Sequence, residues 1–253
     1  MAGVTGKVAL VTGAGSAEGI GFACARALAA AGAKVAITAT SERIFDRASS
    51  LRALGFTADL TEPEQVSKLV REVSRALGPI AIVINNAGLV QQGKKSRLAT
   101  LDKTSDEDWQ HHLNINVTTA FNVTRAVLPG MQRKAYGRIV NIASVTGPIV
   151  GIARSGPYAA AKAAMTGLTR ATALENARYG ISCNAVLPGW IATASATPAE
   201  RRAGKATPAG RAGTPDEVAA CGLFLASEEA SYVNGAMLVV DGANTIVEMK
   251  GAE

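Results

Sequence analysis

Short apolar runs rich in β-branched residues alternate with longer segments of helical periodicity along the chain. The apolar runs cover residues 8–12, 34–38, 80–85, 138–143, 181–187 and 236–240. Runs of this length with few polar positions are typical of strands buried on both faces of a sheet. Between them lie segments such as residues 20–31, which precede Gly32, a glycine suited to the end of a helix. The alternation predicts an α/β fold, with a doubly wound parallel sheet of about seven strands and helices on both faces.

One segment departs from this alternation. Residues 191–214 are rich in Ala, Thr, Gly and Pro and lie between the last two expected strands. Such a segment is either an ordinary surface loop or a mobile lid, and its place after the carboxyl end of a strand favours a substrate lid. No other stretch reads as a linker, and 253 residues suit a single Rossmann-type domain over residues 1–253.

Composition argues for a reduced cytoplasmic protein without a metal. No apolar stretch reaches the length of a membrane span before a charged residue interrupts it, and residues 1–7 contain no signal core. Cys24, Cys183 and Cys221 are odd in number and lie far apart among apolar residues, which suits buried thiols. His111 and His112 are adjacent, so on a helix they diverge by about 100° and do not bind one ion together.

The net charge of +6 favours anionic partners, namely nucleotide phosphates, an acidic carrier protein or nucleic acid. Aromatic residues make up only 4% of the chain, and the basic residues are scattered rather than arranged in a stripe. We therefore expect no nucleic-acid partner, and phosphates or an acidic carrier remain.

The first expected strand runs directly into the glycine-rich stretch TGAGSAEGIG, residues 12–21, which leads into a helix. Glycines at this turn let the backbone approach a pyrophosphate, whose charge the helix N-terminus stabilises. The first strand-to-helix connection is where a dinucleotide-binding fold needs such a turn. Cofactor contacts are therefore expected from Gly13, Gly15, Ser16, Gly19 and Ile20.

The end of the second expected strand distinguishes the two nicotinamide cofactors. An acid there binds the ribose 2′-hydroxyl and repels a 2′-phosphate. Here Thr40 or Ser41 could cap the next helix, and Arg43 in its first turn could pair with a phosphate. NADP(H) is thus preferred. NAD(H) is the alternative, because Glu18 and Glu42 are nearby and Arg43 could instead be solvated.

A tyrosine and a lysine stand one helical turn apart in SGPYAAAKAAM, residues 155–165. The alanine run predicts a helix after Pro157, so Tyr158 and Lys162 share one face of it. Taken alone, the pair also fits a core tyrosine beside a lysine that extends to solvent. The other motifs must decide between these interpretations.

In order and over nearly the whole chain, the motifs resemble the classical short-chain dehydrogenase/reductase family. The resemblance rests on Tyr158-x-x-x-Lys162, Ser144, Asn85-Asn86-Ala87-Gly88, Asn116 and Pro188-Gly189. It implies further cofactor contacts from Asp59, Leu60, Asn86, Ala87, Gly88, Tyr158, Lys162, Pro188, Gly189, Ile191 and Thr193. Residues 231–244 resemble the tetramer-forming end of that family, which implies a homotetramer. One departure is a cofactor loop two residues longer than is usual there.

The resemblance implies catalytic roles that agree with the chemistry of the side chains. Tyr158 would donate a proton to a ketone oxygen in reduction and accept one in oxidation. A nearby ammonium favours a phenolate, so Lys162 would lower the pKa of Tyr158, and it would also bind the nicotinamide ribose. Ser144 would stabilise the developing alkoxide. Asn116 would hold a water that links Lys162 to solvent.

The substrate is less well defined by the sequence. Within the family the chain looks most like 3-oxoacyl-acyl-carrier-protein reductases, through residues 38–41, 158–162 and 211–218, but many alcohol and sugar dehydrogenases share these signatures. An acidic carrier would favour basic residues at the site entrance. Candidates for this role, or else solvated surface charges, are Arg133, Lys134, Arg138 and Arg178.

Three hypotheses follow. The first is an NADPH-dependent reductase of 3-oxoacyl thioesters or similar ketones, with the substrate carried on acyl carrier protein or coenzyme A. The second is an NAD-dependent alcohol, polyol or sugar dehydrogenase. The third is a dinucleotide-sensing binding protein without catalysis, against which the complete set of Asn116, Ser144, Tyr158 and Lys162 argues.

Overall fold

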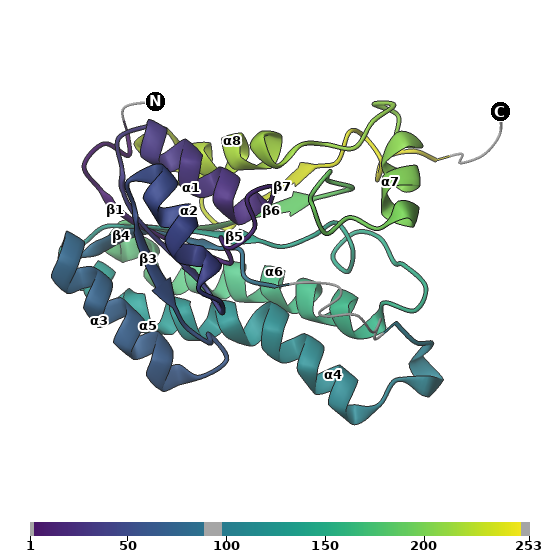
Figure 1. Ribbon diagram of the computed structural model, residues 1–253, viewed down its shortest axis with the longest axis horizontal. Coiled ribbons are helices and arrows are strands. Elements are labelled where there is room, and N and C mark those ends of the chain that lie inside the picture. The colour runs from purple at the N-terminus through teal and green to yellow at the C-terminus, as the bar shows by residue number, and fades with distance from the viewer. Residues whose placement is uncertain (1–2, 89–97, 249–253) are drawn as a thin grey trace.

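The computed structural model describes residues 3–88 and 98–248. Its centre is a parallel sheet of seven strands in the order β3-β2-β1-β4-β5-β6-β7 (Figure 1). The strands are β1 (Val8–Thr12), β2 (Lys34–Ala39), β3 (Leu54–Thr57), β4 (Ile80–Asn85), β5 (Gly137–Ile142), β6 (Ile181–Pro188) and β7 (Met237–Val240). The expected doubly wound fold is confirmed. Only β3 lacks an apolar run in the sequence, because this edge strand is half-exposed rather than buried on both faces.

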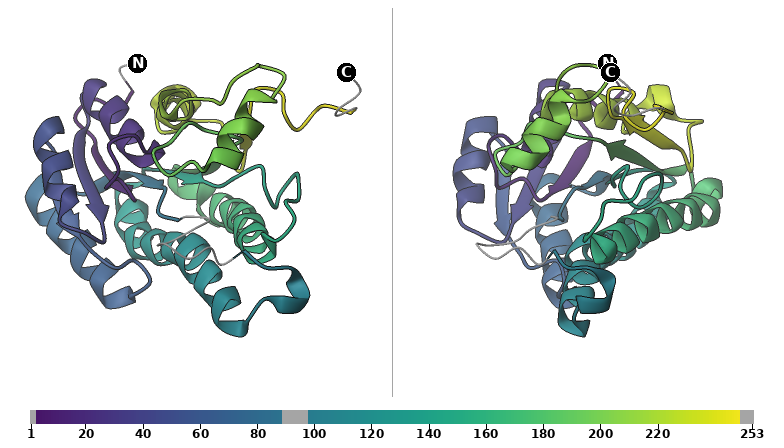
Figure 2. Two further views of the ribbon diagram at one scale, coloured as in Figure 1. Left: turned by 45° about the vertical axis from the view of Figure 1, so that its right-hand side comes forward. Right: turned by 90° about the vertical axis from the view of Figure 1, so that its right-hand side faces the viewer.

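Helices cover both faces of the sheet, as Figures 1 and 2 show. They are α1 (Ile20–Ala30), α2 (Arg43–Leu51), α3 (Pro63–Leu77), α4 (Asp106–Leu113), α5 (Thr119–Lys134), α6 (Gly156–Asn176), α7 (Pro198–Lys205) and α8 (Pro215–Leu225). Buried residues of α1, α2 and α8 form one apolar core with the sheet, and those of α3 and α5 form another on the opposite face. Within the described ranges, no helix has the length and apolar character needed to cross a bilayer.

The strand order reverses between β1 and β4, and this is where a ligand crevice is expected. The Thr12 hydroxyl at the end of β1 donates to the Ile84 carbonyl over 3.3 Å and accepts from the backbone amides of Asn86 and Ala87, each over 3.0 Å. The Asn86 side-chain amide in turn donates to the carbonyls of Thr12 and Gly13. The two loops that open the crevice are therefore held together by side chains at the strand ends.

The four basic residues considered for a site entrance lie at the opposite end of the sheet. Arg133 and Lys134 end α5 just before β5, Arg138 lies at the start of β5, and Arg178 precedes β6. Each helix returns the chain to the amino ends of the strands, away from the crevice at the carboxyl ends. These residues therefore do not form a basic entrance, and Arg133, Lys134 and Arg178 are exposed, in agreement with the alternative of solvated surface charges.

Arg138 instead forms a buried structural cluster. The residue is 4% exposed, and its guanidinium donates to the carbonyls of Gly137, Gly180 and Ser227, at 2.8–3.3 Å, and to the Glu228 carboxylate at 3.2 Å. The ammonium of Lys7 binds the same carboxylate at 3.0 Å. Each guanidinium nitrogen of Arg138 has a hydrogen-bond acceptor, so the buried charge is paired. The acceptors come from three segments of the chain, which the side chain therefore links.

Replacing Arg138 by Ala is expected to lower the free energy of unfolding by about 3 kcal/mol, since it removes a buried charge and leaves carbonyls without donors. Arg133→Ala is the matched control, because Arg133 is exposed on the same end of the molecule and should change stability by less than about 0.5 kcal/mol. Urea denaturation of the two variants measures the difference. Equal midpoints would contradict the structural role.

Candidate active site

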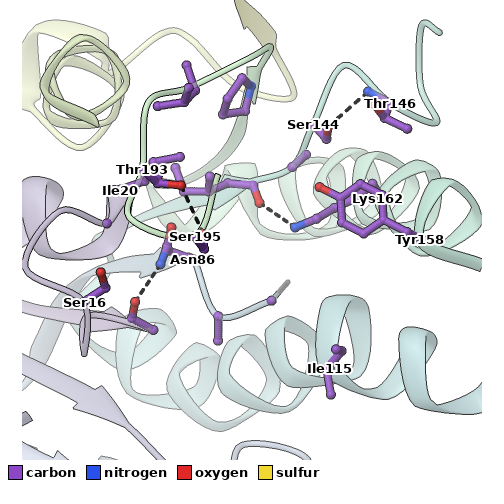
Figure 3. Close-up of a pocket in the computed structure, with 18 of the residues that line it drawn as sticks. Ser16, Ile20, Asn86, Ile115, Ser144, Thr146, Tyr158, Lys162, Thr193 and Ser195 are labelled. Atoms are coloured by element: carbon purple, nitrogen blue, oxygen red, sulfur yellow. Dashed lines mark hydrogen bonds between the residues drawn. The ribbon is translucent and has the colours of Figure 1, made fainter. Parts of the chain in front are cut away.

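A cavity of about 1370 Å³ opens at the carboxyl ends of the strands (Figure 3). Pockets for drug-sized ligands are typically about 300–1,000 Å³, so this one has room for a dinucleotide together with a small substrate. Its wall contains the residues expected to bind the cofactor: Gly13, Gly15, Ser16, Gly19, Ile20, Thr40, Arg43, Asp59, Leu60, Asn86, Ala87, Gly88, Pro188, Gly189, Ile191 and Thr193. It also contains Ser144, Tyr158 and Lys162. The fold brings these distant segments to one site.

The glycine-rich turn approaches its neighbours too closely for larger side chains. Gly13 has φ +67°, and a Cβ there would lie 2.8 Å from the Ala87 Cα. A Cβ on Gly21 would lie 2.7 Å from the Gly13 carbonyl oxygen. Residues 16–18 are exposed, so the longer loop extends into solvent while the glycines keep the turn tight. No side chain caps the start of α1 at Gly19, which leaves its amides for the phosphates of a dinucleotide.

The turn after β2 presents a cation to the cavity. Arg43 lines the wall together with Thr40 and Ser41, and its Nε donates to the Ser41 hydroxyl over 3.2 Å. Glu18 and Glu42 are exposed and are not among the lining residues. The expected capping of α2 by Thr40 or Ser41 is wrong: the N-cap position is Glu42, without a side-chain cap, and the Ser41 hydroxyl binds Arg43 instead.

Helix α6 positions the tyrosine and the lysine as its sequence predicts. It begins at Gly156 with Pro157 in its first turn, and the Lys162 Nζ lies 5.8 Å from the centre of the Tyr158 ring. The ammonium donates to the Ile142 carbonyl at the end of β5 over 3.0 Å, which draws it into the base of the cavity (Figure 3). Ser144, two residues beyond β5, accepts a hydrogen bond from the Thr146 amide over 3.0 Å. Three polar groups thus converge where β5 meets α6.

Burial dominates the protonation of this pair. It raises the pKa of Tyr158 to about 12, against a hydrogen bond with Ser144 that acts to lower it, while the negative charge of Glu200 adds to the rise. Burial also lowers the pKa of Lys162 to about 8. The expected lowering of the Tyr158 pKa by Lys162 is therefore wrong for the protein alone, because desolvation outweighs the one interaction that lowers this pKa, the hydrogen bond with Ser144.

Asn116 lies behind the cavity wall rather than in it. It is fully buried in a π-helical segment, Asn114–Thr118, that packs against α6, and its side-chain amide donates to the His112 carbonyl over 3.2 Å. A Cβ on Gly88, which lines the cavity, would lie 2.6 Å from its Oδ1, so the Asn116 side chain lies directly against this part of the wall. Such π-helical turns occur frequently at functional sites. No motif in the sequence predicts this irregularity, whose neighbouring residues Asn114, Ile115 and Thr119 line the cavity.

Similarity to known proteins agrees with this geometry. A family model described as enoyl-(acyl carrier protein) reductase matches residues 13–244. The 3-oxoacyl-(acyl-carrier-protein) reductase of Vibrio cholerae (serotype O1) is 40% identical over 244 residues, which cover 94% of this chain and 96% of that protein. The chain belongs to the short-chain dehydrogenase/reductase family. As a member, it is an NAD(P)-dependent oxidoreductase that acts on CH–OH and C=O groups.

Other members of the family with different named activities are similar to nearly the same degree. The D-beta-hydroxybutyrate dehydrogenase of Cupriavidus necator is 36% identical over 261 residues, covering 94% of this chain and 98% of that protein. The crystal structure of levodione reductase superimposes with a TM-score of 0.89 at 32% identity, covering 96% of this chain and 99% of that one. Family membership therefore defines the reaction type and leaves the substrate open.

Other polar residues line the cavity, including several from α4, α6 and α7 or the loops beside them, to which sequence reasoning assigned no role in the site. They are His111, Asn114, Thr146, Ser155, Ser195, Thr197, Glu200 and Asn244. Most have no distinctive motif, because their place in the wall depends on how α4 and α7 pack. Glu200 is the exception: Thr197-Pro-Ala-Glu200 is a helix-start signature inside the segment assigned to a lid.

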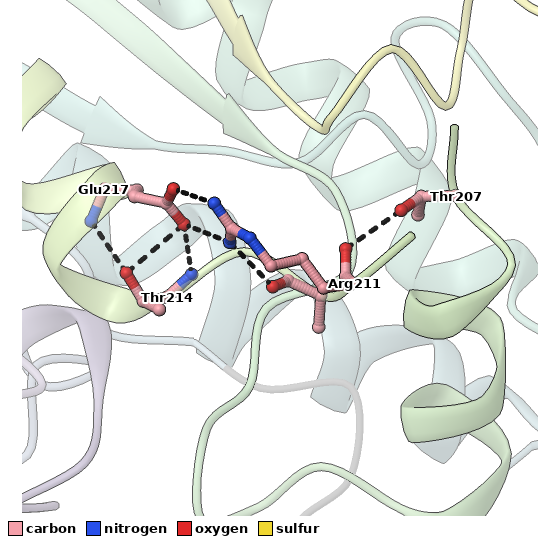
Figure 4. Close-up of polar contacts among 5 residues, drawn as sticks. Thr207, Arg211, Thr214 and Glu217 are labelled. Carbon is pink, nitrogen blue, oxygen red and sulfur yellow. Dashed lines mark hydrogen bonds and ion pairs between the residues drawn. The ribbon is translucent and has the colours of Figure 1, made fainter. Parts of the chain in front are cut away.

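This segment, residues 191–214, is fastened at both of its ends. Ile191 and Gly213 form a parallel bridge, in which the Ala192 amide donates to the Gly213 carbonyl and the Gly213 amide donates to the Trp190 carbonyl. Arg211 makes two hydrogen bonds to the Glu217 carboxylate, at 2.9 and 2.6 Å, and Thr207 donates to the Arg211 carbonyl (Figure 4). Helix α7 lies between these ends and covers the cavity.

Proposed function

We propose that the protein is an NADP(H)-dependent reductase of 3-oxoacyl thioesters or similar ketones, with Tyr158 as its general acid. The observation that carries this proposal is the convergence of Ser144, Tyr158 and Lys162 at one end of a cavity that has room for a dinucleotide. We further propose that the chain forms a single domain, in which residues 191–214 act as the substrate lid. We also propose that the protein is cytoplasmic and assembles as a homotetramer.

The nicotinamide cofactor supplies the hydride when it is bound. Tyr158 donates the proton that the ketone oxygen needs, and burial keeps the phenol protonated at neutral pH in the ligand-free protein. The Ser144 hydroxyl, held by the Thr146 amide, stabilises negative charge on the same oxygen. The Lys162 ammonium binds the nicotinamide ribose beside Tyr158. Asn116, which lies beside α6, supports the supply of protons from solvent to Lys162.

The residues present fit a dinucleotide. The tight glycine turn and the uncapped start of α1 receive the pyrophosphate, while Asp59 and Leu60 follow β3 at the adenine end. Thr40 and Arg43 receive the adenosine ribose and a 2′-phosphate. The preference for NADP(H) is supported by Arg43 in the wall, together with the position of Glu18 and Glu42 outside it.

Arg43→Ala should therefore reduce kcat/KM for NADPH by about 10- to 100-fold, as expected for the loss of one or two charge-assisted bonds to phosphate, and change the value for NADH little. Steady-state kinetics with both cofactors measures the ratio. Arg47→Ala is a suitable control, because Arg47 lies one turn further along α2 and does not line the cavity. An unchanged NADPH/NADH ratio in Arg43→Ala would contradict the assignment.

The proposed reaction itself is tested by following absorbance at 340 nm with either cofactor and a panel from acetoacetyl thioesters to simple ketones and aldoses. Fast NADPH oxidation on the thioester supports the proposal. No turnover of the thioester, together with turnover of a simple ketone or an aldose with NADH, would support the second candidate, an NAD-dependent alcohol, polyol or sugar dehydrogenase. The polar wall near α4 and α7, and the similarity to D-beta-hydroxybutyrate dehydrogenase, favour keeping this candidate.

A further inference from the structure

Helices α7 and α8 begin with the same sequence pattern. Both start as Thr-Pro-x-Glu, at residues 197–200 and 214–217, and both form a capping box. Glu200 accepts from the Thr197 amide over 2.6 Å, and Glu217 accepts from the Thr214 amide over 2.7 Å. Capping accounts for a glutamate at each position, since it satisfies backbone donors at the helix start. A further role for either must come from what surrounds the carboxylate.

The surroundings of the two carboxylates differ. Glu217 is bound by both terminal nitrogens of Arg211 at the surface, and this hydrogen-bonded cation lowers the pKa of Glu217 to about 2 (Figure 4). Glu200 lines the active-site cavity and is close enough to Tyr158 for its negative charge to raise the pKa of that phenol. The capping bond to Thr197, which also lines the cavity, fixes the orientation of the Glu200 carboxylate.

The charges around the cavity make this position distinctive. The charged side chains in the described part of its wall are Arg43, Asp59, Lys162 and Glu200. Arg43 and Asp59 follow β2 and β3 at the cofactor end, and the Lys162 ammonium is bound to the Ile142 carbonyl at the base. Glu200 therefore supplies the charge on the α7 side of the cavity, where a substrate would lie over Tyr158.

We propose that Glu200 is a specificity-determining residue that admits ketones whose acyl end is neutral, such as esters and thioesters, and excludes the corresponding free 3-oxo acids. The inference rests on the proposed function, because it assumes that the ketone oxygen lies at Tyr158. Two carboxylates a few ångströms apart in a partly desolvated pocket repel each other, and this repulsion is worth about 10- to 100-fold in relative kcat/KM. A thioester or ester removes one of these charges and so avoids the repulsion.

The test compares acetoacetate with methyl acetoacetate, which share a carbon skeleton and differ in charge. Glu200→Gln is the informative variant, since glutamine keeps the capping box but removes the charge. We expect the ratio of kcat/KM for the ester to that for the acid to fall at least about tenfold, mainly through a lower KM for acetoacetate. Glu217→Gln is the matched control: it neutralises the equivalent capping residue outside the cavity and should leave the ratio unchanged.

Equilibrium binding separates this inference from the proposed function. Calorimetric titration of the two ketones into the protein with oxidised cofactor measures affinity without turnover. The inference is supported if the wild-type protein binds methyl acetoacetate more tightly than acetoacetate and if this difference in affinity is smaller in Glu200→Gln. This result would support the role of Glu200 even if neither ketone were reduced. Absence of reduction would count against the proposed function alone. An unchanged ester-to-acid ratio in Glu200→Gln, or failure of the wild-type protein to bind the ester, would overturn the role of Glu200.

Discussion

Tyr158→Phe lowers kcat by about a thousandfold if the phenol is the proton donor, because general acid catalysis typically contributes about 10²- to 10⁴-fold. The substitution removes one hydroxyl and keeps the aromatic ring beside the Lys162 ammonium, so the fold and the cavity should persist. Burial raises the pKa of Tyr158 to about 12, so at neutral pH the group that is lost is a protonated phenol. The measurement is steady-state turnover with saturating cofactor and ketone.

Tyr179→Phe provides the control for this substitution. Tyr179 follows α6 at the other end of the sheet, and its hydroxyl accepts a surface hydrogen bond from Arg178 over 2.8 Å. This variant should retain full kcat. The same cofactor affinity in both variants and the wild type, measured by fluorescence titration, would show that the loss in Tyr158→Phe is in the chemical step. Full turnover by Tyr158→Phe would refute the proposed mechanism.

The sheet could be predicted from the sequence, because strands that are buried on both faces of a parallel sheet are almost entirely apolar. The six apolar runs match six strands to within one residue at either end, and the alanine run after Pro157 matches the start of α6. The i, i+4 spacing of Tyr158 and Lys162 then placed both side chains on one face without further information. Local periodicity alone is enough for these features.

Features that depend on packing at a distance were predicted less well. Sequence alone offered Arg138 as an entrance residue or a surface charge, whereas it is buried and its carbonyl acceptors come from residues 137, 180 and 227, which only the fold brings together. The π-helical turn around Asn116 has no motif of its own. Glu200 stood in a segment assigned to a lid by composition, and its relation to Tyr158 depends on where α7 lies over the cavity.

Lys162→Met is expected to reduce turnover strongly and, at neutral pH, to stabilise the ligand-free protein. Turnover should fall at least about a hundredfold, since the variant removes a cation from the reacting end of the cavity. Stability should rise because burial lowers the pKa of Lys162 from 10.5 to about 8, which corresponds to an ammonium that destabilises the fold by about 3 kcal/mol at pH 7. Loss of the hydrogen bond to the Ile142 carbonyl offsets about 1–2 kcal/mol of this gain.

The stability difference between the wild type and Lys162→Met should depend on pH. Between pH 8 and pH 10.5 the unfolded chain keeps the Lys162 proton while the folded protein releases it, so the wild-type free energy of unfolding gains a favourable contribution as pH rises through this window. The Met variant lacks that contribution, and its advantage should shrink from pH 7 to pH 10. Cys24 and Cys183, whose pKa values burial raises to about 12, titrate equally in both proteins and cancel in the difference.

Urea denaturation of both proteins at pH 7 and pH 10 measures the effect. A Met variant less stable than the wild type at pH 7, or an advantage that does not change with pH, would show that the buried ammonium is not the destabilising group.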